Sequence, residues 1–353
     1  MAKFRVLDLE KDKFVYQKYL ENILKKTAYH LPEYLLAEKS AENGWIKIFI
    51  YEENDEFALI PMVVKAVNSL PYLLEVNECI YDMITPHEYG GILSNSNNYG
   101  IKKKLLKEVI GYCKENRIIF QFIRVNPYLS DLVTVFRDCD YEVIHSCDQI
   151  YINLRQTEQE IIGDYKSNVR RNIRRAQSEN LEFEISCKTE KNIEIFSIMY
   201  KKSMEILQAK KFLYFNKEYF RKLIACECSR LCFVKDQQGN VLAASILVLG
   251  NDVVYYHLGC FDRNCALKRP MNYLMHSMIL WGKKMNYHFF HLGGGGKSLL
   301  QFKEGYSSSR IKYYIAVKIC DENKYKMICE RWKNQFPQYA TEKFYPLYRY
   351  NES

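Results

Sequence analysis

Three apolar runs joined by two tight turns constrain the fold of this chain most strongly. Residues 231–236, 241–250 and 253–261 read LCFVKD, VLAASILVLG and VVYYHLGCF, and the polar turns between them carry glycine, asparagine and aspartate. Short runs rich in β-branched and aromatic residues, separated by such turns, predict an antiparallel meander. A meander here excludes a doubly wound, wholly parallel sheet.

Both halves of the chain follow one plan of helices, an antiparallel meander, a helix and further strands. Residues 45–64 predict a hairpin with its turn at 53–56, and residues 99–116 predict a helix followed by a strand that ends at Asn126-Pro127. In the second half, residues 188–228 predict two helices before the meander, and residues 268–285 a long helix after it.

At 353 residues the chain is long enough for two domains. We therefore expect an α/β fold of the α+β kind with two tandem domains, at 1–155 and 156–353. Each should have a mostly antiparallel mixed sheet flanked by helices. A basic helix at 164–180 is expected at the junction.

The charge is formally +9, from 51 basic and 42 acidic residues. This excess favours a polyanionic ligand or an anionic surface, although a mildly basic protein without such a partner is the plain alternative. The most basic stretch holds five lysines and arginines within residues 166–175. On a helix Arg170 and Arg174 share one face, which is either a solvated face or a site for phosphates.

The cysteines and the N-terminus bear on the cellular setting. Twelve cysteines are scattered through apolar runs, which is typical of reduced thiols in a chain of this size. Their spacing fits no zinc motif, so no metal site is expected. The start of the sequence lacks a signal-peptide pattern, and no window reaches the roughly 20 apolar residues of a membrane span. We expect a cytoplasmic location, which is compatible with peripheral contact with a membrane.

Residues 291–298, HLGGGGKS, partly match a phosphate-binding loop. That motif is G-x-x-x-x-G-K-[ST], and Gly296, Lys297 and Ser298 fit its end, but His291 stands at the first glycine position. Too little chain follows for the remaining βα units of a nucleotide hydrolase. The glycines are better interpreted as a bend that lets the backbone approach a substrate.

The same region resembles the signature of the FemAB-like acyltransferases, a branch of the GNAT superfamily with two acetyltransferase-like domains in one chain. Residues 292–307, LGGGGKSLLQFKEGYS, follow that family's glycine run, apolar pair and F-K-x-G-[FY]. Four further stretches are similar to the family's patterns, namely PMNYLM at 270–275, NVRRNIRRA at 168–176, the 81–91 stretch with its YGG, and FIRVNP at 122–127. His87 and Asn126 depart from the usual residues, and residues 264–270 lack the glycines of a coenzyme A pyrophosphate loop.

The resemblance implies two GNAT-like domains and transfer of an acyl or aminoacyl group onto an amine, or a hydroxyl, of a cell-envelope glycan or peptidoglycan precursor. The donor would be aminoacyl-tRNA or acyl-CoA, without a tightly bound cofactor. The acceptor would be a nucleotide- or lipid-linked glycan or muropeptide, with tRNA as a partner if it is the donor, and DNA is not expected. The alternatives are an acetyl-CoA-dependent sugar N-acetyltransferase of surface-polysaccharide synthesis and a non-catalytic protein that binds RNA or envelope precursors.

The candidate site residues follow from the motifs and the resemblance. Acyl transfer needs charge stabilisation at the carbonyl oxygen, which the Lys303 ammonium could supply, although it could also be a plain surface lysine. His291 and Asp82 are candidates for handling the proton or the acceptor. The substrate-binding candidates are Arg124, Arg174, Tyr89, Gly293, Gly294, Gly295, Phe302 and Tyr306, and the donor-binding candidates are Lys268, Arg269 and Asn272.

Overall fold

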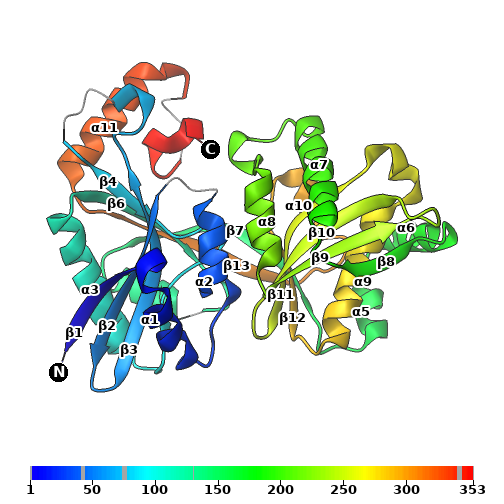
Figure 1. The fold of residues 1–353 in the computed structure, drawn as a ribbon, viewed down its shortest axis with the longest axis horizontal. Helices are drawn as coiled ribbons and strands as arrows, with labels where there is room; N and C mark the ends of the chain where they lie inside the picture. Colours follow the sequence, from blue (N-terminus) through cyan, green and yellow to red (C-terminus); the bar gives the residue numbers. More distant parts are fainter. Residues whose placement is uncertain (1, 41–43, 74–77, 130, 340–343, 353) are drawn as a thin grey trace. The chain divides into compact units, whose positions relative to one another are not determined.

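The computed structural model describes residues 2–40, 44–73, 78–129, 131–339 and 344–352. They form two compact units, unit 1 with residues 1–146 and 313–353, and unit 2 with residues 147–312 (Figure 1). The division expected from the sequence instead assigned all of 156–353 to one domain. Residues 313–353 fall in unit 1 because residues 314–319 hydrogen-bond with a strand of that unit and the segment after them packs into its core.

The sheet of unit 1 is mostly antiparallel. Its strands, in hydrogen-bonded order, are β1 (Lys3–Asp8), β2 (Trp45–Glu53), β3 (Glu56–Ala66), β4 (Tyr81–Ile84), β6 (Ile118–Val125) and β13 (Arg310–Ile319), with the short β5 (Leu93–Ser94) beside β3. β4 and β6 are the parallel pair. The expected hairpin is confirmed, and its turn residues Asn54 and Asp55 have φ values of 49° and 65°, as a tight two-residue hairpin turn requires.

Helices cover the sheet of unit 1. They are α1 (Leu9–Glu21), α2 (Pro32–Lys39), α3 (Tyr99–Glu115), α4 (Leu132–Arg137) and α11 (Glu322–Gln335). Alternate residues of β2 separate into two cores, because Phe49 joins the cluster under α3 whereas Ile48 and Ile50 join the one under α1 and α2. The expected helix at 99–116 is thus α3.

The sheet of unit 2 contains the expected meander. Its order is β7 (Glu142–Asn153), β12 (Phe289–Gly293), β11 (Val253–Phe261), β10 (Val241–Leu249), β9 (Ser229–Lys235) and β8 (Glu182–Ser186), and all neighbours are antiparallel except β11 and β12. The parallel pairing of β11 with β12 is short, from Val253–Phe289 to Tyr255–His291. After Tyr255 and His291, β11 and β12 no longer pair with each other.

Six helices surround this second sheet in the described part of unit 2: α5 (Glu158–Asp164), α6 (Ser167–Ser178), α7 (Glu190–Ile206), α8 (Lys217–Ala225), α9 (Pro270–Lys284) and α10 (Lys297–Lys303). The helices α6 and α9 share a core with Cys232 and Val234 of β9, whereas the α7–α8 pair lies over the other face (Figure 1). The expected α/β fold, with mostly antiparallel strands flanked by helices in each unit, is confirmed. Among the described residues, no helix is long and apolar enough to cross a membrane.

A buried ion pair ties the C-terminal segment to the sheet of unit 1. Asp82 of β4 accepts hydrogen bonds from Arg349 Nε at 2.6 Å and Nη2 at 2.9 Å, and from the Tyr348 hydroxyl at 3.0 Å. Arg349 Nη2 also donates to the Ala66 carbonyl of β3 at 3.0 Å. Asp82 is fully buried and Arg349 is 6% exposed, so the pair is complete only while the segment stays docked.

Replacing Arg349 by methionine should therefore lower the free energy of unfolding by about 3–5 kcal/mol, because it leaves the Asp82 carboxylate buried without its cation. Urea denaturation followed by circular dichroism measures this. The matched control is Arg117→Met, which removes an exposed arginine paired with Glu78 at 3.6 Å and should cost less than about 1 kcal/mol. Equal losses in the two variants would show that the segment is not held by this pair.

Candidate functional site

The bend after β12 depends on glycine at two positions. Gly293 has a φ of 74° and Gly295 a φ of 141°, a region that residues with side chains rarely adopt. A Cβ on the intervening Gly294 would lie 3.2 Å from Cys147 Sγ, so the backbone runs close to β7 there. The glycines turn the chain from β12 into α10, which begins at Lys297. They therefore form the expected bend.

Lys303 is buried against this bend. It is the last residue of α10, is 5% exposed, and its Nζ donates a hydrogen bond to the Gly294 carbonyl at 2.5 Å. The same Nζ lies 5.6 Å from the ring centroid of Tyr256 on β11. The alternative of a plain surface lysine is thus wrong. An ammonium fixed in a largely water-excluded place is suited to stabilise a developing negative charge.

His291 precedes the bend on β12 and is fully enclosed. Its Nε2 lies 3.1 Å from Gln149 Oε1, and its ring meets the Tyr255 ring edge-on at 5.4 Å between centroids. Burial, and then the nearby charge of Lys303, lowers the pKa of His291 to about 3. The imidazole is therefore neutral at physiological pH and a weak proton acceptor, which fits support of Lys303 better than general-base catalysis.

The residues of the F-K-x-G-Y motif join α10 to α6 and α9. A Cβ on Gly305 would lie 2.6 Å from Val169 Cγ2, so only glycine lets α6 pack this closely. The Gly305 carbonyl accepts from the Lys166 amide at 2.8 Å, just before α6 begins. The Tyr306 hydroxyl accepts from Asn272 Nδ2 of α9 at 2.9 Å. The motif therefore fixes the end of α10, and with it Lys303, on two helices.

A polar cleft of about 580 Å³ opens beside this joint. Its lining includes the cations Lys166 and Arg269 and several amide side chains, with Glu304 paired to Arg310. The full lining is Lys166, Asn168, Val169, Asn172, Arg269, Asn272, Gln301, Phe302, Glu304 and Gly305. Three predicted residues, Phe302, Arg269 and Asn272, lie on it, whereas Lys303 does not. A cleft with this lining suits a phosphorylated or hydroxyl-rich ligand.

Several backbone amides at the start of α9 and just before it are engaged in backbone hydrogen bonds. Residues Arg263–Lys268 form a 3-10 helix, and the Arg269 amide bonds to the Ala266 carbonyl. In the first turn of α9, the amides of Asn272 and Tyr273 both bond to the Arg269 carbonyl. Pro270 has no amide hydrogen to offer. An anion here would therefore be bound by the side chains of Lys268 and Arg269 more than by backbone amides.

The remaining predicted residues divide between the units. Asp82 carries the ion pair described above, which gives it a structural task. Arg124 donates from Nη1 to the Thr85 carbonyl at 2.9 Å, and Tyr89 packs edge-on against Tyr29 and Tyr313. These three belong to unit 1. Arg174 lies exposed on α6 in unit 2, with the glycines, Phe302 and Tyr306.

Two residues next to Lys303 were not anticipated. Gln149 pairs with His291, and the ring of Tyr256 lies under the Lys303 ammonium. A Cβ added to Gly259 would lie only 2.1 Å from the Tyr256 hydroxyl oxygen. A polar side chain inside an apolar strand, such as Gln149 in the run QIYINL, was the available signal. Tyr256 carried none, because tyrosine is ordinary in a strand.

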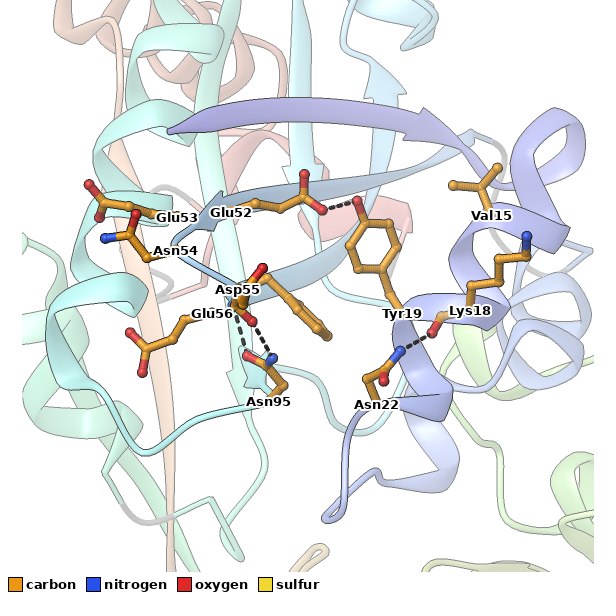
Figure 2. Close-up of a pocket in the computed structure, with 11 residues that line it drawn as sticks. Val15, Lys18, Tyr19, Asn22, Glu52, Glu53, Asn54, Asp55, Glu56 and Asn95 are labelled. Carbon is orange, nitrogen blue, oxygen red and sulfur yellow. Dashed lines mark hydrogen bonds between the residues drawn. The ribbon is translucent and has the colours of Figure 1, made fainter. Parts of the chain in front are cut away.

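A second cleft, of about 620 Å³, lies in unit 1 and contains no predicted site residue (Figure 2). It surrounds the turn of the β2–β3 hairpin and is largely acidic. Its polar groups are mostly engaged with one another: Glu52 accepts from Tyr19, and Asn95 bonds to the Phe57 amide at 2.8 Å and to the Asp55 carbonyl at 2.9 Å. It therefore offers little to an anionic substrate.

The buried histidines should make stability depend on pH. The pKa of His291 is about 3 and that of His30, buried in unit 1, about 4, against 6.5 for each when exposed. As the pH falls, the histidines take up protons in the unfolded chain before they do so in the folded protein. The free energy of unfolding should therefore be highest above about pH 6.5 and decrease as the pH drops toward 4. The decrease should be at most about 1.4 kcal/mol per pH unit for each histidine. Urea midpoints between pH 8 and 4.5 measure this slope.

The variant His291→Asn should have a shallower slope than the wild type, since one of the buried histidines with a lowered pKa is gone, whereas His30 and His276 remain. The matched substitution at the surface is His288→Asn, at a half-exposed histidine. An unchanged slope in His291→Asn would contradict the assigned burial.

Comparisons with known proteins agree with this geometry. Residues 163–304 match the model of the acetyltransferase (GNAT) domain. Among solved structures, FemX has a TM-score of 0.67 at 13% identity and covers 93% of this chain and 99% of its own. L-PGS from Bacillus licheniformis has a TM-score of 0.59 at 14% identity, with 91% and 96% covered. The C-terminal DUF2156 domain of an Agrobacterium fabrum protein, assigned as a lysylphosphatidylglycerol synthetase, has a TM-score of 0.59 at 12% identity, with 87% and 92% covered.

No curated protein sequence matches the chain. The chain therefore carries a GNAT domain within unit 2, ending one residue after Lys303, and over most of its length has the fold of FemX and L-PGS. This confirms the expected fold, which the chain shares with FemX.

Proposed function

We propose that this protein is an acyltransferase that moves an acyl or aminoacyl group onto an amine, or a hydroxyl, of a cell-envelope glycan or peptidoglycan precursor. The observation that carries the proposal is the buried Lys303 ammonium at the glycine bend of the matched GNAT domain. An envelope acceptor is supported by the fold shared with FemX and with a protein whose name specifies a lysyl group on a phospholipid.

Lys303 is the group we assign to the carbonyl oxygen of the donor. When the acceptor nitrogen attacks, a C–N bond forms, negative charge builds on the oxygen, and the bond to the departing oxygen or sulfur then breaks. The proton lost by the amine is taken up by that leaving group. Lys303 can shift its hydrogen bond from the Gly294 carbonyl toward the developing oxyanion, since Gly294 lies at the bend that a substrate would approach.

For the donor, the structure supports aminoacyl-tRNA more than acyl-CoA. In the segment that would hold a pyrophosphate, the amides of Arg269, Asn272 and Tyr273 are engaged in backbone hydrogen bonds. The exposed side chains of Arg171 and Arg174 on α6 make no ion pair or hydrogen bond with any described residue, and are available to RNA phosphates. The alternatives are an acetyl-CoA-dependent sugar N-acetyltransferase and a non-catalytic protein binding RNA or envelope precursors.

Incubation with a cell-envelope extract and either labelled aminoacyl-tRNA or labelled acetyl-CoA tests the function. We expect label to leave the aminoacyl-tRNA and to appear on an envelope component. Consumption of acetyl-CoA instead would support the sugar N-acetyltransferase. If neither donor is consumed while tRNA binds, the protein is a binding module and the catalytic proposal fails.

The double variant Arg171→Gln, Arg174→Gln should raise the KM for aminoacyl-tRNA about tenfold or more and reduce its salt dependence, with kcat nearly unchanged, because phosphate contacts act on binding. Arg175→Gln is the matched control, since Arg175 on the same helix is already paired with Glu179 at 2.6 Å. An unchanged KM in the double variant would exclude this helix as the RNA-binding surface.

A further inference from the structure

An exposed apolar surface lies at the end of α7 and in the loop that follows. We call residues 198–214, which include the 3-10 helix Lys211–Leu213, the α7 tip. Its side chains Ile198, Ile206, Leu207 and Tyr214 are between 43% and 60% exposed. Several large, exposed apolar side chains in one short segment are typical of an interaction site.

Lysines surround these apolar side chains. Lys201, Lys202, Lys210 and Lys211 are all exposed, and Glu205 is the only acidic residue in the α7 tip. Glu205 lies 3.9 Å from Lys201, at the outer limit of an ion pair. Along α7, Ile198, Lys202 and Ile206 follow one another at a spacing of four, so apolar and basic groups share a face.

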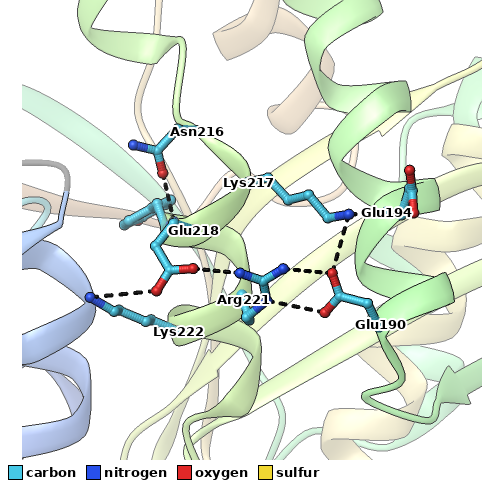
Figure 3. A network of polar contacts seen from close by, with 8 residues as sticks. Glu190, Glu194, Asn216, Lys217, Glu218, Arg221 and Lys222 are labelled. Atoms are coloured by element: carbon cyan, nitrogen blue, oxygen red, sulfur yellow. Dashed lines mark hydrogen bonds and ion pairs between the residues drawn. The ribbon is translucent and has the colours of Figure 1, made fainter.

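The opposite end of the same helix pair is charge-balanced (Figure 3). Glu190 accepts from Arg221 at 2.7 and 3.1 Å and pairs with Lys217 at 3.1 Å. Glu194 and Glu218 complete the network, at 3.3 Å from Lys217 and 2.6 Å from Arg221. These pairs attach α8 to α7 and match three carboxylates with three cations.

The loop of the α7 tip is itself held in place. The Tyr214 hydroxyl donates to the Met204 carbonyl, near the end of α7, at 3.0 Å. Tyr214 therefore contacts the last turn of the helix at Met204, two residues before Ile206 in sequence, while its ring stays partly exposed. The part of the loop that carries Tyr214 is thus tied to the last turn of α7.

We propose that the α7 tip docks on an anionic lipid surface. Isoleucine and leucine side chains can enter the interface between headgroups and acyl chains, while the lysines keep their ammonium groups at the phosphates. Lysines near an anionic bilayer each add to the attraction. RNA would use the cations but has no place for Ile206 and Leu207, so a lipid surface is the better fit for this combination of side chains.

This inference goes beyond the proposed acyl transfer and does not depend on it, because vesicle binding is measured without donor or acceptor. The two would be related if the acceptor is lipid-linked, since docking would then bring unit 2 to the membrane that holds it. A failure of docking would leave the acyltransferase proposal untouched.

Cosedimentation with vesicles tests the docking. The full-length protein should bind vesicles of phosphatidylcholine mixed with phosphatidylglycerol at least about tenfold more tightly than vesicles of phosphatidylcholine alone, and salt should weaken that binding. Two double variants test the two kinds of side chain. One carries Ile206→Ser with Leu207→Ser, the other Lys201→Gln with Lys202→Gln, and each should weaken binding about fivefold or more. All four side chains are exposed, so the variants should fold normally.

The matched control is Lys326→Gln, Lys333→Gln on α11, which removes two exposed lysines outside the α7 tip and should bind like the wild type. Three results would overturn the proposal. They are equal binding to neutral and anionic vesicles, binding unaffected by either pair of changes in the α7 tip, and loss of tRNA binding without loss of vesicle binding in the lysine variant. The last result would assign the surface to RNA.

Discussion

The hydrogen bond from Lys303 to the Gly294 carbonyl connects the two elements on which the candidate site is built. One is the bend after β12, which needs glycine at two positive φ values, and the other is α10, whose end is fixed by Gly305 against Val169. Neither element alone would hold an ammonium in a buried place. A charge that is removed from water needs such partners to remain where it is, and this makes the arrangement rigid as well as polar.

The electrostatics around Lys303 favour a cation that stays in place. His291 remains neutral because it is buried next to that charge, and Gln149 fixes its ring from β7. The aromatic ring of Tyr256 faces the same ammonium. The Gly294 carbonyl and the Tyr256 ring both favour a cation at Lys303 Nζ.

The local part of the fold could be predicted from the sequence because it depends on neighbouring residues. The turn at Asn54-Asp55, the meander of β9 to β11 and the helix α9 all follow from periodicity and turn chemistry. The pairing of β13 with β6, between residues nearly 200 apart, has no such local signal, so residues 313–353 were expected in the other domain.

For the site, the glycines, Lys303 and Tyr306 were predicted because their motif is contiguous, and the structure brings them together. Gln149, by contrast, reaches His291 only through the β7–β12 pairing, and the partner of Asp82 comes from the end of the chain. These contacts depend on tertiary packing.

Basic groups on unit 2 have different neighbours. Arg171 and Arg174 of α6 are exposed, Lys166 and Arg269 line a cleft rich in amides, and the α7 tip combines lysines with exposed isoleucine, leucine and tyrosine. A net charge alone favours any polyanion, whereas the neighbours of each group distinguish RNA, a phosphorylated ligand and a lipid surface.

The rate of the chemical step in a Lys303→Met variant tests the account most directly. Methionine preserves much of the buried stem but removes the charge, so a single-turnover measurement with bound donor isolates the stabilisation of the carbonyl oxygen. The account predicts a loss of about 100- to 1000-fold in that rate, with donor affinity and folding retained, and no comparable loss in the control Lys297→Met at an exposed lysine of the same helix. A variant that transfers the acyl group at the wild-type rate would contradict it.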